Sequence, residues 1–387
     1  MGSHFHIIYK LMKYYLIAGE ASGDLYGSQL INEIKNLDHD AQFRCWGGDL
    51  MKGQGGDLVK HYKGHNFMGF LEVIINLKSI LKNIKFCKKD IVDNKPDALI
   101  LIDFPGFNMR IAKFIKSNTR IPVLYFIAPQ VWAWKESRVK KIRKYIDKLF
   151  VILPFEKKYF DSKGIEVSYN GHPLVEYIER FINENALGKE EFYSKYQLDH
   201  KKENIILLPG SREQEIEKKL PIMLNACKHR EDQFNIIIGG IRHLKNVYYK
   251  IGLESNVSII YNDTYNILNH SSVAFVTSGT ATLETALFNV PQIVCYKSSW
   301  ISYLIAKMLV KVKYISLVNL ILNKETVKEL IQSDLSVLNL KNNLDNILDQ
   351  KSHLETILHD YKALKNLCQG NNVPKLTARE MLKTISS

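Results

Sequence analysis

Short apolar runs, separated by longer amphipathic stretches, restrict the possible folds of this chain more than any other feature. The first half contains four such runs, at 14–19, 97–103, 122–128 and 148–154. Strands that are apolar on both faces are typical of parallel sheets, which helices cover on both sides. The alternation therefore predicts a doubly wound α/β domain made of strand–helix–strand units.

The same alternation starts again after a polar stretch at about 177–203. The second set of apolar runs lies at 204–210, 234–240, 257–261, 272–279 and 291–297. Beyond residue 323 the pattern is helical and polar, with no further strong strand. The sequence thus predicts two Rossmann-like domains followed by a helical tail. We expect an N-terminal domain at 12–185, a connection at 186–203, a second domain at 204–335 and the tail at 336–387.

Charge distinguishes this chain from an average globular protein more than its overall composition does. Lysine and arginine number 53 against 40 aspartates and glutamates, which gives a net charge of +13. That balance predicts an anionic partner: a nucleic acid, a phosphorylated substrate or an acidic membrane surface. The five cysteines are far apart and form no C-x-x-C pair. They are therefore expected to be reduced thiols in a cytoplasmic protein.

The N-terminus and the apolar segments bear on targeting. The first residues lack a long apolar stretch followed by a small-residue cleavage site, so we expect no secretory signal. Met12 stands just before the first strand, and residues 1–11 are expected to be an extension or an expression remnant. No uncharged apolar run reaches about 18 residues, so no spanning helix is expected.

Ligands of doubly wound folds bind where strands end and helices begin, and the junction "LIDFPGFN" is the first of interest. Asp103 ends a buried run and is followed by Pro105 and Gly106, a turn signal. A carboxylate at that place can act as a general base. An aspartate that accepts backbone hydrogen bonds within its own turn is the alternative, and the pattern leaves both open.

The junction "AGEASGDLYG" has glycines at 19, 23 and 27 but does not match G-x-G-x-x-G. No acidic residue clearly ends a second strand to hold a ribose, so a dinucleotide site is not expected. Ser22 and Asp24 are at places where they would cap the following helix.

In "LLPGSREQE", Ser211 is placed to cap a helix that begins at Arg212. Gln214 takes the third helical position of a capping box, and Glu215 comes one residue late. An arginine in the first turn of a helix opposes the macrodipole, so it needs another reason. A bound phosphate would provide one, because guanidinium pairs with phosphate in a bidentate fork.

The stretch "FVTSGTATLE" at 275–284 ends a buried strand and opens a helix on residues with little side-chain bulk. Ser278, Gly279 and Thr280 would let an anion approach the free backbone N–H groups of that helix. Position 281 is Ala, so Glu284 has no Ser or Thr three residues before it to complete a capping box. We interpret Glu284 as an acceptor of hydrogen bonds from ribose hydroxyls, with the helix N-terminus holding phosphates.

Two helical segments have apolar faces edged by lysines, at 66–86 and at 300–313. Most such faces point to a protein core, yet they also suit an acidic lipid interface. The sequence "DHD" at 38–40 matches a D-x-D motif for a divalent ion, but it lies in a polar loop after an amphipathic helix. His172 has no neighbouring Cys or second His at metal-ligand spacing, so we expect no metal. Neither G-x-S-x-G nor a Walker A loop is present.

Taken together in their order along the chain, several motifs resemble those of lipid-A-disaccharide synthases. They are "AGEASGD", "MGFLEV", "APQVWAWKESRVKKI", "LPFEKKYFDSKGI", "GHPL", "LPGSREQEI", "SGTATLE" and "YISLVNLI", and the match extends over about 14–335. The resemblance implies a GT-B glycosyltransferase with two facing Rossmann-like domains. Such an enzyme joins UDP-2,3-diacylglucosamine to 2,3-diacylglucosamine 1-phosphate (lipid X), giving the β-1,6 lipid A disaccharide phosphate and UDP by inversion. It needs no cofactor and no metal.

The resemblance also implies roles for particular residues. Asp103 would accept the proton of the acceptor 6-hydroxyl, and Glu20 and Ser22 would lie near the transferred sugar. Arg212 would stabilise charge on the departing UDP. The UDP-sugar site as a whole would comprise Ser211, Arg212, Ser278, Gly279, Thr280, Glu284 and Asn319. Around Tyr296 and at Gln292 the sequence departs from the family pattern, so uracil contacts stay open.

The same resemblance implies a cytoplasmic enzyme that associates peripherally with the anionic inner membrane. The residues expected to face acyl chains or the bilayer are Phe67, Met68, Phe70, Leu71, Ile74 and Leu77. The family also suggests a homodimer with an exchanged C-terminal segment.

Two rival interpretations remain at this point. One is another GT-B enzyme acting on UDP-N-acetylglucosamine, either a 2-epimerase or a cell-wall glycosyltransferase, but an isomerase has no need of lysine-edged apolar helices. The other is a non-enzymatic basic module that binds membranes or nucleic acid. It gives no role to Glu20, Asp103 and Glu284, whose carboxylates would repel phosphate backbones, so no nucleic-acid partner is expected.

Overall fold

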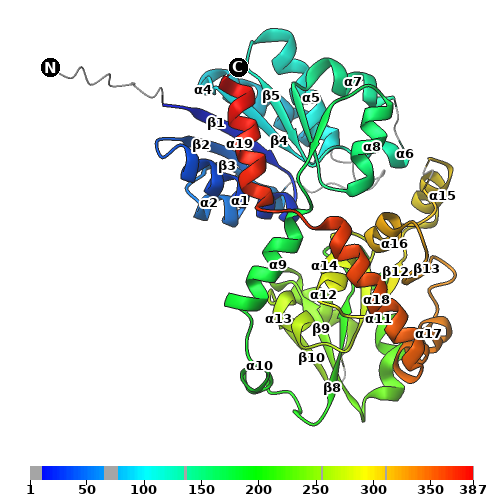
Figure 1. Ribbon diagram of the computed structural model, residues 1–387. Coiled ribbons are helices and arrows are strands. Elements are labelled where there is room, and N and C mark those ends of the chain that lie inside the picture. Colours follow the sequence, from blue (N-terminus) through cyan, green and yellow to red (C-terminus); the bar gives the residue numbers. More distant parts are fainter. Residues whose placement is uncertain (1–10, 65–76, 135–136, 254–255, 310–311, 387) are drawn as a thin grey trace. The chain divides into compact units, whose positions relative to one another are not determined.

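The computed structural model describes residues 11–64, 77–134, 137–253, 256–309 and 312–386. It divides into two compact units (Figure 1). The first unit comprises Met1–Pro173 and Gly370–Ser387, and the second comprises Leu174–Gln369. The chain thus leaves the first unit earlier than the sequence-based boundary at 185, and its last 18 residues return there instead of forming one tail.

The first unit is built on a seven-stranded sheet in the order β3-β2-β1-β4-β5-β6-β7. All neighbouring strands pair in parallel. This confirms the doubly wound sheet expected from the apolar runs. The strands are β1 (Lys13–Ala18), β2 (Gln42–Gly47), β3 (Asp57–His61), β4 (Ala98–Ile102), β5 (Val123–Phe126), β6 (Lys148–Val151) and β7 (Val167–Tyr169).

Helices cover this sheet and bury its central strands. Every residue of β4 and β5 is buried, because helices pack on both faces of the sheet. The helices of the unit are α1 (Ala21–Leu37), α2 (Asp49–Gly53), α4 (Leu77–Asn94), α5 (Pro105–Asn118), α6 (Val131–Trp134), α7 (Arg138–Tyr145), α8 (Pro154–Ser162) and α19 (Val373–Ser386). The C-terminal helix α19 contacts α1, so the two ends of the described chain meet in one unit (Figure 1).

The second unit has a six-stranded parallel sheet in the order β10-β9-β8-β11-β12-β13. Its strands are β8 (Glu203–Leu208), β9 (Phe234–Gly240), β10 (Val257–Tyr261), β11 (Val273–Thr277), β12 (Gln292–Tyr296) and β13 (Lys328–Ile331). The helix α9 (Pro173–Glu184) leads into the unit. The other helices are α10 (Lys189–Lys195), α11 (Glu213–Cys227), α12 (Lys245–Ile251), α13 (Thr264–Asn269), α14 (Thr280–Leu287), α15 (Trp300–Leu309), α16 (Leu317–Leu322), α17 (Val337–Asp349) and α18 (Lys351–Cys368).

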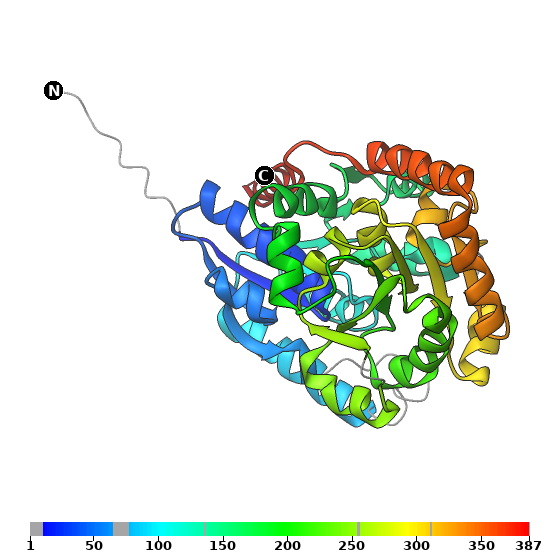
Figure 2. The ribbon, with the colours of Figure 1, turned by 90° about the horizontal axis from the view of Figure 1, so that it is seen from below.

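The segment expected to be a separate helical tail is instead part of both units. Helix α17 contacts β11, β12 and β13, and α18 contacts α14 and α16. Figure 2 shows these orange and red-orange helices along one side of the second unit. Leu340, Leu344, Ile357 and Leu364 are buried in these contacts. The helical character of this segment was expected from its pattern, whereas its packing was not.

Within the described residues the sequence pattern did not predict four strands: β2, β3, β7 and β13. Strand β13 lies beyond residue 323, where no further strong strand was expected. The strands β3, β7 and β13 are at sheet edges and are only three to five residues long. Most of their residues are half-buried, so they lack the continuous apolar run that marks a central strand.

Candidate functional site

The candidate residues lie in the loops that follow four central strands, two strands in each sheet. In the first sheet, β1 and β4 are neighbours, and the chain proceeds from them in opposite directions across the sheet. In the second sheet β8 and β11 have the same relationship. Such switch points leave a crevice at the carboxyl ends of the strands, where open α/β sheets bind ligands. Glu20 and Asp103 follow the first pair of strands, and Arg212 and Ser278 follow the second.

Asp103 follows β4 directly and has an unusual backbone. Its φ angle is 44° and that of Phe104 is 50°, so two successive residues that are not glycine have left-handed conformations. The carbonyl oxygen of Asp103 accepts hydrogen bonds from the Tyr125 hydroxyl at 2.6 Å and from the Asn108 amide at 2.7 Å. These two donors hold a backbone conformation that would otherwise cost about 1–3 kcal/mol per residue.

The environment of Asp103 changes its acidity. Burial raises the pKa of the Asp103 carboxyl to about 6, while the backbone N–H of Phe104 opposes that rise. Burial likewise raises the pKa of Glu156 to about 7, and the charge of Asp103 adds to the rise. Glu156 accepts hydrogen bonds from the indole of Trp132 and from the N–H groups of Ile152 and Leu153. Raised carboxyl pKa values of this kind are typical of groups that exchange protons near neutral pH.

Glu20 and Ser22 begin the helix after β1. Glu20 is the N-cap residue of α1 and Ser22 is in its first turn; both are partly exposed. Asp24 does not cap its own helix as the sequence suggested. Its carboxylate accepts hydrogen bonds from the N–H groups of Gly48, Leu50 and Met51, and thereby caps α2.

The loop after β8 differs in detail from the capping that we expected. Arg212, not Ser211, is the N-cap residue of α11, which begins at Glu213. Glu215 provides the carboxylate: it accepts a hydrogen bond from the Ser211 N–H at 3.1 Å and pairs with the Arg212 guanidinium at 3.3 Å. The N-cap role expected of Ser211 was therefore wrong, because the helix begins one residue later and the loop places Glu215 against the backbone. Arg212 is partly exposed beside this carboxylate.

The loop after β11 opens helix α14 with little side-chain bulk, as the sequence indicated. Gly279 is the N-cap residue, with φ 141° and ψ −161°, and a Cβ atom there would meet no atom within 4 Å. The Ser278 hydroxyl donates to the carbonyl of Ile315 at 2.8 Å. The N-cap position thus presents backbone without a side chain, and Thr280 begins the helix.

Glu284 is near this helix start, and Tyr265 fixes its orientation. The Tyr265 hydroxyl donates to the Glu284 carboxylate at 2.8 Å. Burial raises the pKa of Glu284, and this hydrogen bond counteracts the rise. The Glu284 side chain is partly accessible, and the hydrogen bond from Tyr265 holds its carboxylate in one orientation.

Asn319 is buried on α16, and its side-chain amide is hydrogen-bonded within the protein. Its amide donates to the Val327 carbonyl and to Glu329, and its oxygen accepts from the N–H groups of Thr326 and Val327. Glu329 also binds the Ser316 hydroxyl at 2.8 Å. Asn319 therefore organises the segment around 316–329, which in turn contacts Ser278 through Ile315 and Thr282 through Leu317.

The residues expected to face a membrane lie mostly outside the described residues: Phe67, Met68, Phe70, Leu71 and Ile74. Leu77, the first residue of α4, is described and is 45% exposed. Leu81 and Phe86 on the same helix are 53% and 46% exposed, whereas Ile84 of this helix is buried in the core. Among the described residues no helix is both long and apolar enough to cross a membrane. In the same part of the chain no group of three His, Cys, Asp or Glu residues could hold a metal ion.

Two Rossmann-like parallel-sheet units with polar loops at both switch points define the GT-B class. Solved structures agree with this fold. A UDP-GlcNAc 2-epimerase from Neisseria meningitidis, bound to UDP-GlcNAc, has a TM-score of 0.69 and 13% identity, covering 96% of this chain and 100% of that one. The UDP-GlcNAc 2-epimerase of Methanocaldococcus jannaschii has a TM-score of 0.63 and 12% identity, with 96% and 100% covered. At these identities the likeness concerns the fold alone.

Sequence comparison is more specific. The family model described as "Lipid-A-disaccharide synthetase" matches residues 14–382. Lipid-A-disaccharide synthase 1 of Legionella pneumophila is 34% identical over 356 residues, 90% of this chain and 91% of that protein. The lipid-A-disaccharide synthase of Syntrophus aciditrophicus is 37% identical over 324 residues, with 82% and 83% covered. The chain therefore belongs to the lipid-A-disaccharide synthetase family and is a glycosyltransferase.

Proposed function

We propose that this chain joins UDP-2,3-diacylglucosamine to 2,3-diacylglucosamine 1-phosphate, forming a β-1,6 disaccharide 1-phosphate and UDP with inversion. Family membership over nearly the whole chain supports the substrates and the reaction. The observation that carries the mechanism is the carboxylate of Asp103, at a switch point and on a backbone held by two hydrogen bonds.

Asp103 is the general base of the proposed mechanism. It accepts the proton of the acceptor 6-hydroxyl while that oxygen attacks the anomeric carbon from the face opposite UDP. A carboxyl whose pKa is near 6 is mostly ionised at neutral pH and yet basic enough to share a proton in the transition state. General-base catalysis typically contributes about 10²–10⁴-fold. Glu20 and Ser22, at the adjacent strand end, are assigned to the sugar being transferred.

The second unit is assigned to the nucleotide. The start of α14 at Gly279 and Thr280 binds the diphosphate through backbone N–H groups, with Ser278 in the same loop and Ser211 in the loop after β8. Arg212 neutralises the charge that develops on departing UDP, and losing such a donor typically costs about 10²–10³-fold in rate. Glu284 accepts hydrogen bonds from the ribose hydroxyls. Asn319 acts by holding the segment that supports this loop.

We place the enzyme at the cytoplasmic face of the inner membrane as a peripheral protein. Exposed Leu77 and Leu81 on α4 stand beside exposed Lys78, Lys82 and Lys85, an arrangement that suits an anionic lipid surface. The net charge of +13 supports the same assignment. Co-sedimentation with vesicles of anionic and of neutral lipid tests it, and equal binding to both would contradict it.

The proposed assembly is a homodimer that exchanges its C-terminal segment. Within one chain the amide of Asn170 is 3.4 Å from the hydroxyl of Thr377 on α19. In an exchanged dimer the same contact joins two subunits. A double variant with Asn170→Cys and Thr377→Cys would then oxidise to a covalent dimer, whereas an unexchanged chain would form only an internal disulfide.

A turnover assay tests the proposed reaction. Purified protein is incubated with UDP-2,3-diacylglucosamine and lipid X in detergent containing EDTA. We expect disaccharide phosphate and UDP in equal amounts. Conversion of UDP-N-acetylglucosamine to its 2-epimer, without disaccharide formation, would instead support the isomerase alternative.

A further inference from the structure

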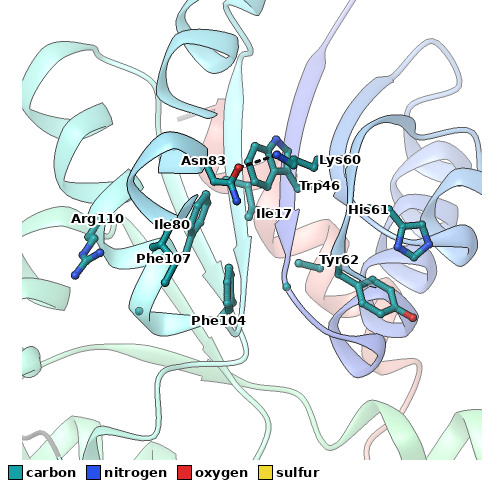
Figure 3. A pocket seen from close by; sticks show the side chains of 13 residues that line it. Ile17, Trp46, Lys60, His61, Tyr62, Ile80, Asn83, Phe104, Phe107 and Arg110 are labelled. Carbon is teal, nitrogen blue, oxygen red and sulfur yellow. Dashed lines mark hydrogen bonds between the residues drawn. The ribbon is translucent and has the colours of Figure 1, made fainter. Parts of the chain in front are cut away.

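A cavity of about 150 Å³ opens within the first unit at the carboxyl end of β1. Ile17 on β1, Trp46 on β2, Ile80 on α4 and the rings of Phe104 and Phe107 form its walls (Figure 3). Its surface is mostly apolar. Mostly apolar walls favour a hydrocarbon group, because burying it there removes apolar surface from water. The chemistry of the walls therefore points to a hydrocarbon ligand.

The aromatic wall is fixed by its neighbours. The Phe104 and Phe107 rings stack with centroids 5.3 Å apart, and Trp46 is 5.2 Å from Phe107. A Cβ atom on Gly19 would come within 2.4 Å of Cγ of Phe104, so only glycine lets the ring occupy this place. Since Phe104 directly follows Asp103, a ligand bound against the ring lies at the loop that carries the proposed base.

Two cations border the same cavity. The Lys60 ammonium donates to the Asn83 amide oxygen at 2.7 Å and is 5.6 Å from the centre of the Trp46 ring (Figure 3). Both partners are neutral, so these contacts leave the positive charge uncompensated. Arg110 lines the cavity from α5 and is exposed. An apolar cavity bordered by cations matches an amphiphile with a hydrocarbon chain and an anionic head.

We propose that this cavity binds one acyl chain of the lipid acceptor, with Lys60 beside the phosphate of the same molecule. The inference rests on the proposed function and specifies how the acceptor is held next to Asp103. Burying each methylene contributes about 0.8 kcal/mol, which corresponds to roughly fourfold in affinity. The cavity holds only a limited number of methylenes, so the gain must stop at a definite chain length.

The first test measures binding without turnover. The whole chain is titrated by calorimetry with a series of n-alkyl phosphates below their micelle concentrations. We expect affinity to rise roughly fourfold per methylene and then to level off. A rise that continues along the whole series would indicate adsorption to a surface and would overturn the proposal.

A filling variant locates that binding. Gly106 lines the cavity, and a Cβ atom there meets nothing within 4 Å, so Gly106→Leu adds apolar volume at the cavity from a position with open space. It should abolish the dependence on chain length. Gly53→Leu is the matched control, because Gly53 also has open space around it but is on α2 away from the cavity. Ile80→Trp fills the cavity from another wall. Unchanged chain-length dependence in both filling variants, if they are folded, would contradict the inference.

The proposed contact between Lys60 and the phosphate can be tested separately. Lys60→Gln should weaken binding of an alkyl phosphate by roughly tenfold and leave the corresponding alkyl alcohol unaffected. Equal weakening of both ligands would assign Lys60 to packing alone and would remove the proposed phosphate contact.

Competition kinetics distinguish the acceptor from membrane phospholipid as the source of the chain. Alkyl phosphate should inhibit turnover competitively against lipid X and not against the UDP-sugar. Non-competitive inhibition against lipid X would assign the cavity to a membrane lipid and overturn the proposal.

If lipid X is not turned over but alkyl phosphates still show the plateau, the proposed function fails, although the hydrocarbon site stands. If turnover occurs and Gly106→Leu leaves the chain-length dependence unchanged, only the cavity assignment fails.

Discussion

The hydroxyl of Tyr125 donates a 2.6 Å hydrogen bond to the backbone carbonyl of Asp103, from the neighbouring strand of the same sheet. Asn108 donates to the same oxygen from the helix that follows. Neither residue touches the Asp103 carboxylate in these contacts, yet both fix the peptide from which it extends. Two left-handed residues in succession would otherwise relax towards commoner backbone conformations.

Tyr125→Phe should therefore impair turnover more than folding. We expect kcat to fall roughly 10–100-fold, because small misplacements of a catalytic group are costly, with KM little changed. The free energy of unfolding should fall by only about 1 kcal/mol. Tyr193→Phe is the control: its hydroxyl donates to the Lys202 carbonyl and accepts from the Asn204 amide in the second unit, so it should lower stability at least as much and leave kcat intact. Equal kcat values for both variants would refute a positioning role for Tyr125.

The raised pKa of Asp103 predicts the pH dependence of turnover. The base must be ionised, so kcat/KM should fall about tenfold per pH unit below about 6 and be level above it. The acceptor phosphate also titrates near pH 6. Asp103→Glu separates the two: the inflection should move if the carboxyl causes it and stay fixed if the phosphate does.

Asp103→Asn should abolish turnover while UDP binding persists, and simultaneous loss of both would point to a structural aspartate instead.

The pH dependence of stability provides a second test of Asp103. The folded-state pKa is above the ordinary value of 3.8, so the folded chain binds the proton more tightly than the unfolded chain does. The native chain should therefore gain stability as pH falls from about 6 towards 4. Thermal melts of Asp103→Asn should lack this component and should show higher stability at pH 7.

The sequence was sufficient for the central strands and for the loops that follow them. A strand buried on both faces needs a continuous apolar run, and each central strand of both sheets except β2 has one. The connection after such a strand is at the ligand-binding edge in any doubly wound fold. Asp103 and Gly279 could therefore be located before the strand order was known.

Contacts between residues distant in sequence could not be read from the pattern. Asp24 was expected to cap its own helix, and Glu215 seemed one residue late, because hydrogen-bond partners depend on how loops pack. The hydrogen bond from Tyr125 to Asp103 joins two neighbouring strands that are about 20 residues apart in sequence. The sequence offers only a tyrosine inside an apolar strand and an asparagine in the first turns of an amphipathic helix as local signals.

Gly279 allows a prediction about backbone strain alone. Its φ of 141° and ψ of −161° lie in a region that residues with a Cβ rarely adopt, yet the space around it is open. Gly279→Ala should lower the free energy of unfolding by roughly 1–3 kcal/mol without any clash. Gly53→Ala, in an open helical position, should be neutral or slightly stabilising. Urea unfolding of both variants checks this, and equal stabilities would contradict the strain argument.

The contact between Tyr265 and Glu284 allows the ribose assignment to be tested directly. Glu284→Gln keeps the shape of the side chain and an oxygen that Tyr265 can still bind, but it removes the charge. Hydrogen bonds to charged groups contribute about 1.5–3 kcal/mol, so UDP should bind roughly 10–100-fold more weakly. A 2′,3′-dideoxy analogue of UDP lacks the hydroxyls, so its affinity should not change. Glu217→Gln, an exposed charge loss in the same unit, should leave both affinities intact. If calorimetry shows equal weakening for UDP and the analogue, Glu284 acts on the fold of the loop and not on the ribose.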